Sequence, residues 1–163
     1  MSTKSNAKSK TKQLSKEQLL EAIRKKRECN ARAQAIVESL LERDITEDDF
    51  LLKLKDINQS HYDDVVDERH ILHFCSYPLC DVIVENVPTK QYQICTATNK
   101  VFDVTDRKKF CSTQCFKASE YIKSQMLTSP LWLRQQEIIP QFKLLKIKED
   151  DDAILEFESL KIN

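Results

Sequence analysis

Four cysteines in two close pairs constrain this chain more than any other feature. Cys75 and Cys80 form the first pair, Cys111 and Cys115 form the second, and thirty residues separate the pairs. Each pair can turn two sulfurs toward one ion from a single bend, and two such bends make the tetrahedral four-thiolate site typical of structural Zn²⁺. A disulfide framework is the alternative, but ten of the first 32 residues are Lys or Arg and no signal-peptide pattern is visible. We therefore expect a reducing compartment and one structural zinc ion.

The predicted zinc site has no open coordination position at which a reaction could take place. Four thiolates fill a tetrahedron, whereas a catalytic zinc keeps one position open for water or substrate. His70 and His73 precede the first pair and are competing ligands, but four cysteines already complete the coordination. We expect any reaction to take place beside the metal and not on it.

The chain contains no glycine, whereas average usage would place about eleven in this length. Glycine-rich phosphate loops, dinucleotide-binding fingerprints and the nucleophile elbow of hydrolases are therefore excluded. Turns with positive φ must use Asn, Asp or other residues, or be avoided. This composition favours helices joined by open loops.

The apolar periodicity predicts helices before and after the cysteine-containing stretch. Ser15 with Gln18, Thr46 with Asp49, Ser60 with Asp63 and Ser112 are their expected N-terminal caps. The predicted helices cover residues 15–43, 47–58, 61–72 and 113–126. Cys115 would then lie in the first turn of the last helix, where the helix dipole favours a thiolate.

Between the cysteine pairs the periodicity changes to that of strands. Residues 81–87, 91–95 and 100–104 are expected to form a small antiparallel sheet or hairpin, with a turn at Thr98-Asn99. After Pro130, a short helix carrying Trp132 is expected to pack onto the cysteine module. The predicted fold class is thus mainly α with a small antiparallel β element, a helical protein built around a four-cysteine zinc finger.

Charge is segregated along a chain whose formal net charge is zero. Residues 1–32 carry ten basic and three acidic side chains (+7), and residues 38–68 carry three basic and eleven acidic ones (−8). Such segregation suggests surfaces for partners, and no apolar run is long enough to span a membrane. The expected organisation is a disordered basic tail at 1–13, a helical region at 14–58, the zinc-binding module at 59–148 and an acidic tail at 149–163.

The familiar constellations of phosphatases are absent. No Arg stands six residues after any cysteine, and the only D-x-D run, Asp150–Asp152, lies in the acidic tail. A basic cluster remains near the metal, and it either holds a phosphate or forms a solubilising face. Its members are Lys100, Arg107, Lys108, Lys109, Lys117 and Lys123. The run Arg24–Arg27 is either a nuclear localisation signal or a solvated helix face.

Several motifs together resemble one family, the regulator-of-transcription family, also called RNA polymerase II-associated protein 2. They are Glu68-Arg69, Cys75-Ser-Tyr-Pro-Leu-Cys80, Gln91-Tyr-Gln-Ile94, Asn99-Lys-Val-Phe-Asp103, Phe110-Cys-Ser-Thr-Gln-Cys-Phe-Lys-Ala-Ser119 and Pro130-x-Trp132-x-Arg134. The resemblance covers about residues 60–135. Two departures are Ser76, where the family often has glycine, and Phe116, where it often has tyrosine.

The resemblance implies an atypical protein-serine/threonine phosphatase, a hydrolase acting on the phosphorylated C-terminal repeats of RNA polymerase II. It assigns zinc to the four cysteines, and it places Glu68, Arg69, Tyr92 and Lys117 at the catalytic groove, with Ser119 beside them. Partners would be the polymerase and its repeats, without direct nucleic-acid or membrane binding, and the protein would shuttle between nucleus and cytoplasm. The alternative is a non-catalytic, zinc-stabilised factor for polymerase binding, assembly or nuclear import. A nucleic-acid-binding zinc finger fits poorly, because no basic recognition helix lies between the pairs.

Overall fold

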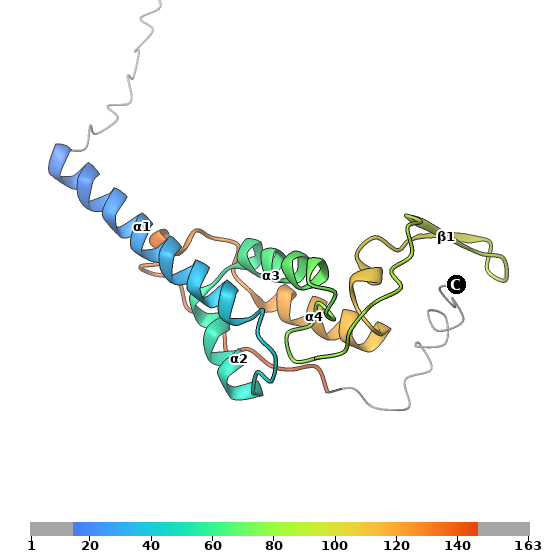
Figure 1. The fold of residues 1–163 in the computed structure, drawn as a ribbon. Coiled ribbons are helices and arrows are strands. Elements are labelled where there is room, and N and C mark those ends of the chain that lie inside the picture. Colours follow the sequence, from blue (N-terminus) through green and yellow to red (C-terminus); the bar gives the residue numbers. More distant parts are fainter. Residues whose placement is uncertain (1–14, 147–163) are drawn as a thin grey trace, which may run out of the picture.

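Helices dominate the computed structural model, which describes residues 15–146 (Figure 1). Its elements are listed here in chain order with their bounds: α1 (Lys16–Ser39), α2 (Glu47–Lys53), the 3₁₀ turn η1 (Leu54–Asp56), α3 (Gln59–Ile71), β1 (Tyr92–Cys95), β2 (Lys100–Asp103), η2 (Arg107–Lys109), α4 (Thr113–Gln125) and η3 (Leu131–Leu133). The predicted fold class is confirmed. The predicted tails at 1–13 and 149–163 lie outside the described residues.

Side-chain caps fix where the helices begin. Ser15 and Gln18 form the predicted capping box of α1, and Thr46 and Ser112 cap α2 and α4 as expected. The cap of α3 was predicted wrongly. Asn58, not Ser60, begins that helix, because its side chain accepts the N–H of His61 while the His61 ring accepts the N–H of Asn58. Helix α1 ends at Ser39 and not at 43.

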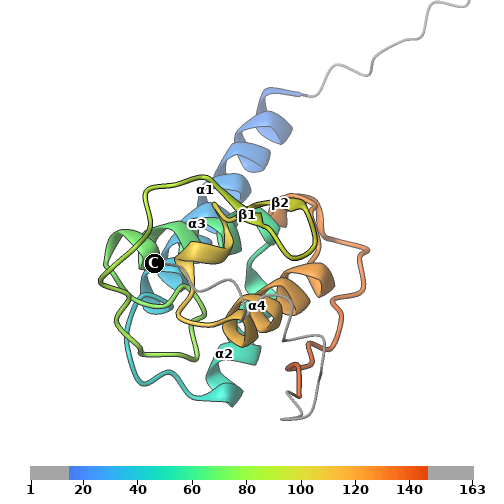
Figure 2. The ribbon, with the colours of Figure 1, turned by 90° about the vertical axis from the view of Figure 1, so that its right-hand side faces the viewer.

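One hydrophobic core joins all four helices. Its fully buried side chains come from α1 and its C-cap (Ala33, Leu40), from the α2–η1 segment (Phe50, Leu54), from α3 (Tyr62, Val65) and from α4 (Ile122). Helix α1 enters this core only with its C-terminal half, and its N-terminal half extends beyond the body of the molecule (Figure 1). Figure 2, viewed from the end that carries the hairpin, shows α2, α3 and α4 gathered around the inner end of α1.

The predicted hairpin is present, but the strand predicted at 81–87 is wrong. β1 and β2 pair antiparallel with Tyr92 opposite Asp103 and Ile94 opposite Val101. Residues 81–87 instead make only an isolated bridge, Ile83 with Phe74. The backbone of this stretch bonds to the chain just after α3, through Cys75 N–H to Val82 O and Val84 N–H to His73 O, both 2.8 Å. This short ladder leads directly into the cysteine loop.

The tryptophan segment packs elsewhere than predicted. η3 does not cover the cysteine module; it lies against α1, where the Lys26 ammonium sits 4.7 Å from the centre of the Trp132 ring. The reason is the partly buried guanidinium of Arg134, which donates to the carbonyls of Ile57, Leu127 and Ser129 and so turns this segment back along the N-terminal part of the fold. Across residues 15–146, no helix combines the length and apolar character needed to cross a membrane.

Within residues 15–146 of this glycine-free chain, three residues adopt positive φ: Asp44 (60°), His73 (62°) and Asn99 (51°). Asn99 lies in the predicted hairpin turn, and Asp44 lies in the connection between α1 and α2. Asn and Asp tolerate this region better than other residues with a side chain. His73 is the unexpected one, and it marks the reversal of the chain between α3 and Cys75.

Candidate functional site

The four cysteines of the two pairs come together at one point. Their sulfurs all lie within 4.8 Å of one another, with 3.7 Å between Cys80 and Cys111 and 3.6 Å between Cys111 and Cys115. A tetrahedron with Zn–S bonds of about 2.3 Å has edges of about 3.8 Å, so these separations fit four thiolates around one such ion. Cys75 is buried, and Cys111 is the most exposed of the four. Neither His70 nor His73 belongs to the cluster.

Local structure presents each sulfur to the site. Cys75 and Cys80 lie on the loop that follows α3, and this loop is held by the Ser76 N–H to Lys109 O bond of 3.1 Å. Cys115 sits in the first turn of α4, where the Ser112 hydroxyl accepts its N–H, as predicted. The N–H of Cys111 points at the Cys75 sulfur over 3.5 Å. The two loops are thus joined by hydrogen bonds as well as by the shared site.

The electrostatics of the cluster favour a bound cation. The hydrogen bond with Cys115 and burial raise the pKa of Cys75, and burial with the nearby Cys115 raises the pKa of Cys111 to about 11. The pKa of Cys115 shifts in the opposite direction. Hydrogen bonds, of which the one with Cys75 has the largest effect, lower it to about 5. The Cys115 thiolate therefore forms readily, whereas the thiols of Cys75 and Cys111 resist ionisation. A divalent cation at the centre compensates several thiolate charges at once.

Arg69 is the main support of this site. Its side chain is fully buried, and its guanidinium donates to the carbonyls of Cys75 (2.9 Å) and Cys80 (2.8 Å). It also donates to the carbonyls of Leu40 and Glu42, just past the end of α1, at 3.0 and 3.1 Å. Burial lowers the pKa of Arg69, and the neighbouring Asp81 opposes this shift. The Arg69 guanidinium thus fixes the loop that carries Cys75 and Cys80 to the chain just past the C-terminal end of α1.

Asp81 completes this junction. Its carboxylate lies 3.8 Å from the Arg69 guanidinium and accepts the N–H of Asp44 at 3.0 Å. The side chain of Arg43 reaches the Asp81 carbonyl at 3.4 Å. The residue directly after Cys80 therefore holds the connection that follows α1, including its positive-φ residue.

A pocket of about 370 Å³ lies beside the metal cluster, between α3 and α4. At its base the hydroxyls of Tyr62 and Ser119 are hydrogen-bonded over 2.9 Å. Phe110 and Phe116 line one side, and their rings meet edge to face at 5.5 Å. Burial raises the pKa of Tyr62 well above its ordinary value. The Tyr62 hydroxyl is therefore a hydrogen-bonding group and not an anion.

Charged side chains line the pocket in ion pairs. Lys109 contacts Asp67 at 2.8 Å and Asp106 at 3.2 Å, and Lys123 contacts Asp63 at 2.7 Å. Glu120 adds a fourth carboxylate. Two lysines thus face four acids, so only part of the predicted basic cluster surrounds this pocket and its net charge is negative.

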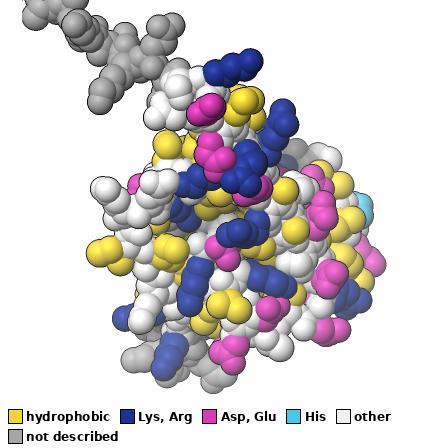
Figure 3. Space-filling view, turned by 90° about the vertical axis from the view of Figure 1, so that its left-hand side faces the viewer, with side chains coloured by type: hydrophobic (Ala, Val, Ile, Leu, Met, Phe, Trp, Pro, Cys, Tyr) yellow, Lys and Arg dark blue, Asp and Glu magenta, His cyan; other side chains and the backbone are white. Residues whose placement is uncertain are grey.

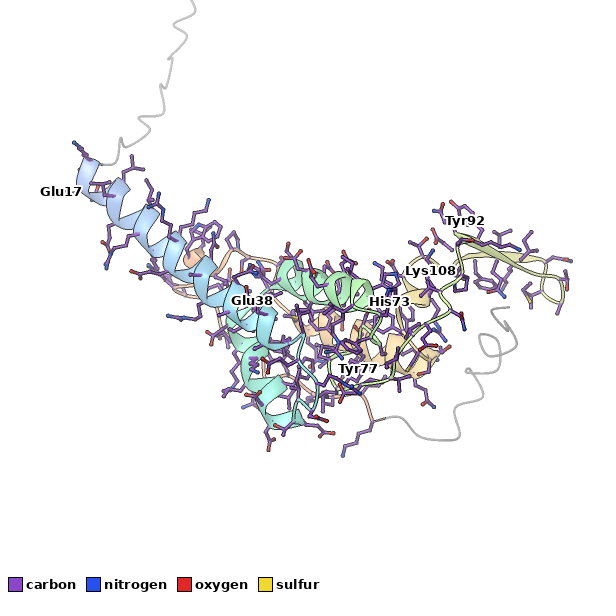
Figure 4. All side chains as sticks on the ribbon, in the orientation of Figure 1. Glu17, Glu38, His73, Tyr77, Tyr92 and Lys108 are labelled. Atoms are coloured by element: carbon purple, nitrogen blue, oxygen red, sulfur yellow. The ribbon has the colours of Figure 1, made fainter. Side chains whose placement is uncertain are left out.

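The four residues placed at a catalytic groove by the resemblance do not line this pocket. Arg69 is in the core, with its donors bound to backbone carbonyls. Glu68 is exposed on α3, and Lys117 is half-buried on α4. Tyr92 is 56% exposed on the hairpin, well away from the helices (Figure 4). Their catalytic role stays a prediction.

Sequence reasoning missed two contributions. Tyr62 extends the stripe of Val65, Val66 and Arg69 at helical spacing, and that periodicity marks it as a buried residue with a hydroxyl to satisfy. The buried role of Arg69 could be found in the same way, since a charged residue on an apolar stripe is buried only when its donors are bound. The carbonyls that bind it come from distant segments and carry no such signal.

Comparison with known proteins gives a consistent result. Residues 55–127 match the Rtr1/RPAP2 family. An RPAP2 homolog of Drosophila melanogaster, named as a candidate phosphatase of the C-terminal domain (CTD) of RNA polymerase II subunit B1, is 55% identical over 130 residues, which are 80% of this chain and 91% of the relative. The RNA polymerase II subunit B1 CTD phosphatase Rpap2 of Rattus norvegicus is 47% identical over 126 residues, 77% of this chain but 20% of that protein.

A solved structure has the same fold. The crystal structure of the transcription regulator protein Rtr1 from Kluyveromyces lactis superposes with a TM-score of 0.58 and 20% identity. The match covers 74% of this chain and 84% of that one. At this identity the likeness speaks for the fold alone.

Proposed function

Because this chain belongs to the Rtr1/RPAP2 family, we propose that it is a protein-serine phosphatase acting on the phosphorylated C-terminal repeats of RNA polymerase II. The names of the relatives support this substrate, and the single structural observation that carries the chemistry is the pocket between α3 and α4. The pocket supplies cationic, acidic, hydroxyl and aromatic groups in one place. We assign the reaction to this pocket and not to the metal.

The pocket has the groups that hydrolysis of a phosphoserine needs. The ammonium groups of Lys109 and Lys123 would leave their carboxylates to hold the phosphate. A carboxylate freed in this way, such as Asp67 or Asp63, takes a proton from a water molecule whose oxygen attacks phosphorus. The bond from phosphorus to the serine oxygen breaks, that oxygen takes up the proton that the carboxylate received from water, and inorganic phosphate is released. The rings of Phe110 and Phe116 offer an apolar surface to the peptide.

The metal would have a structural part in this function. Cys75, Cys80, Cys111 and Cys115 would hold zinc, and the bound ion would fix the loops that carry Lys109 and the start of α4. Arg69 acts as a positioning residue, because its guanidinium holds the Cys75 and Cys80 carbonyls. Of the residues placed at the groove by the resemblance, Glu68, Tyr92 and Lys117 remain candidates for contacts with the polymerase repeats.

A second candidate function is a non-catalytic, zinc-stabilised factor for polymerase binding, assembly or nuclear import. The observation that favours it is the pairing of both pocket lysines with acids, which leaves the pocket net acidic before a ligand arrives. In either case we propose a protein that shuttles between nucleus and cytoplasm. The basic run Arg24–Arg27 lies on α1, and Lys26 within it is exposed. A fluorescent fusion with these four residues changed to alanine would stay in the cytoplasm if the run directs import.

Phosphate release from a phosphoserine heptad peptide tests the proposal. We expect the double change Lys109→Ala with Lys123→Ala to lower the rate at least about tenfold, since phosphate binding is lost. Lys53→Ala is the matched control, because Lys53 makes a comparable 2.7 Å pair with Asp49 far from the pocket, on α2. Peptide binding without phosphate release would favour the second candidate. Glu68→Ala, Tyr92→Phe and Lys117→Ala, assayed alongside, test the catalytic set implied by the resemblance.

A further inference from the structure

Arg107 is bound to the segment that carries the second cysteine pair. It belongs to η2, and its side chain is half-buried. Its guanidinium donates through Nε to the hydroxyl of Thr113 over 3.1 Å and through Nη1 to the carbonyl of Phe110 over 3.0 Å. Phe110 directly precedes this pair in the sequence, and Thr113 lies between its two cysteines. The Arg107 side chain thus holds the backbone on both sides of Cys111.

Within residues 15–146, Arg107 forms no ion pair with a carboxylate. Other basic side chains have acidic neighbours. On the face shown in Figure 3, Lys and Arg side chains lie among those of Asp and Glu, and the buried Arg69 shares its charge with Asp81 at 3.8 Å. Burial removes part of the hydration of the Arg107 guanidinium, and a nearby anion would compensate that loss.

The anionic groups that act on Arg107 are the thiolates of the metal cluster. Burial lowers the pKa of Arg107, and the groups that oppose this shift are all cysteines, with Cys111 first and Cys115 next. Arg69 has the corresponding place at the first pair, where its guanidinium donates to the carbonyls of both cysteines. Each half of the cluster is therefore held by one arginine, and Arg107 is the one whose charge no carboxylate shares.

The loaded metal centre has a surplus of negative charge. Four thiolates bring four negative charges and Zn²⁺ brings two positive ones, so the net charge is −2. Cys75 is buried and Cys80 and Cys115 are half-buried, so water solvates this charge incompletely. A fixed cation beside the centre stabilises ionised, metal-bound thiolates more than neutral thiols, and it thereby raises the affinity for the metal.

We infer that Arg107 is the counter-ion of the loaded metal centre and that its charge strengthens zinc binding. Arg107 acts as a positioning residue, since it contacts the segment that carries the ligands and not the ion. It does not line the pocket between α3 and α4, so it takes no part in holding a phosphate there, and its burial distinguishes it from a solubilising side chain. This role does not depend on the proposed phosphatase activity.

The zinc affinity of the full chain, measured by competition with a chromophoric chelator, tests the role of the charge. We expect Arg107→Gln to bind zinc at least about tenfold more weakly, as when outer partners of metal ligands are removed. Arg107→Lys keeps the charge and loses only the planar fork, so its affinity should stay within about threefold of that of the unmodified chain.

Salt separates the charge from the hydrogen bonds. The deficit of Arg107→Gln should shrink at least about twofold between about 0.1 and 1 M salt, because the screening length falls from about 10 to about 3 Å. The loss of a hydrogen bond alone would not respond in this way. The affinity of the unmodified chain should itself fall as salt rises, and this measurement requires no variant to fold.

Lys108 provides the matched control. It is the next residue of η2 and is also half-buried, but its charge acts on Asp103 and His70 and not on the cysteines. Lys108→Gln should therefore keep the zinc affinity within about twofold. The absorption spectrum of each cobalt-loaded variant checks that four sulfurs still surround the metal in tetrahedral geometry.

Four results would each overturn the inference. The first is an unchanged affinity in Arg107→Gln, and the second is an equal loss in Arg107→Lys. The third is a deficit that salt leaves unchanged. The fourth is a similar loss in Lys108→Gln, which would show that the position of Arg107 has no special effect on the metal centre.

Discussion

The guanidinium of Arg69 and the backbone carbonyl of Cys75 are joined by a 2.9 Å hydrogen bond inside the core. This bond connects the last turns of α3 to the first ligand of the candidate metal site. Further bonds from the same side chain reach Cys80, Leu40 and Glu42. The buried guanidinium of Arg69 thus holds together the loop that carries Cys75 and Cys80 and the chain just past α1.

Replacing Arg69 should therefore destabilise the whole fold. We expect Arg69→Leu to cost about 3–5 kcal/mol of unfolding free energy, since four carbonyls lose their donor and the bonds to Cys75 and Leu40 are buried. Arg69→Lys should be intermediate, because an ammonium cannot reproduce the planar fork. Chemical denaturation followed by circular dichroism measures both values. The exposed Arg24→Lys serves as the control, and a loss below about 1 kcal/mol in Arg69→Leu would contradict the assigned role.

Removing one metal ligand should release the ion and loosen both loops. Elemental analysis of the purified protein should find one zinc per chain, and Cys115→Ser should lose most of it. We expect the midpoint of thermal unfolding to fall by about 10 °C or more, in keeping with a loss of several kcal/mol. Cys29→Ser, which changes a thiol on α1 outside the cluster, should keep the metal. Equal zinc content in the two variants would exclude the four-cysteine site.

The buried hydroxyl pair offers a double-mutant cycle. Tyr62→Phe removes one partner of the 2.9 Å bond and leaves the Ser119 hydroxyl buried without it. We expect a cost of about 1–2 kcal/mol, of which Ser119→Ala in the same chain recovers part. Urea denaturation of the two single variants and the double variant gives the coupling energy. A coupling near zero would mean that the pair adds nothing to stability.

Acid should weaken the fold through His61. Burial lowers the pKa of His61 below the ordinary 6.5, with Arg134 reinforcing this and Asp64 opposing it. The unfolded chain then binds more protons than the folded one, so stability is full above pH 6.5 and is lost as pH falls through the folded pKa. His70, whose pKa is also lowered by burial, acts in the same direction.

The contribution of His61 to the pH dependence of stability can be measured separately, because its ring takes part in the N-terminal cap of α3. Its ring accepts the Asn58 N–H only when Nδ1 is unprotonated, and a cap bond of this kind is worth about 1 kcal/mol or less. His61→Gln keeps an acceptor and cannot titrate, so its stability should fall less between pH 7 and pH 5. Thermal melts across that range measure the difference in slope. Parallel curves for the two proteins would rule out this role of His61.

Local chemistry explains what could be predicted from the sequence. The cysteine spacing, the caps at Ser15 and Ser112 and the hairpin turn at Asn99 all depend on neighbours close in the chain. The failures involve distant partners. The stretch 81–87 alternates like a strand, yet its backbone partners lie just after α3. Trp132 meets Lys26, more than a hundred residues away, and nothing in its own segment indicates this.

In the candidate site, too, features that depend on local spacing could be predicted from the sequence, and features that depend on packing could not. The four cysteines could be identified because metal geometry requires paired thiols, and they do gather. The pocket could not be drawn from the sequence, since its lysines and acids come from α3, η2 and α4 and their pairing depends on how these elements pack. For Arg69 the sequence indicates a position beside the metal loop but not that all its bonds go to carbonyls.

The absence of glycine affects the unfolded chain as much as the folded one. Replacing a glycine by another residue at a compatible position reduces the conformational freedom of the unfolded chain by about 0.4–1 kcal/mol. About eleven glycines would be usual in this length, so the unfolded ensemble is stiffer by several kcal/mol in total. That sum is comparable to the net stability of a small domain. A protein with one hydrophobic core and one candidate metal site thus loses less entropy when it folds, and the turn with positive φ at His73 is a small cost beside that gain.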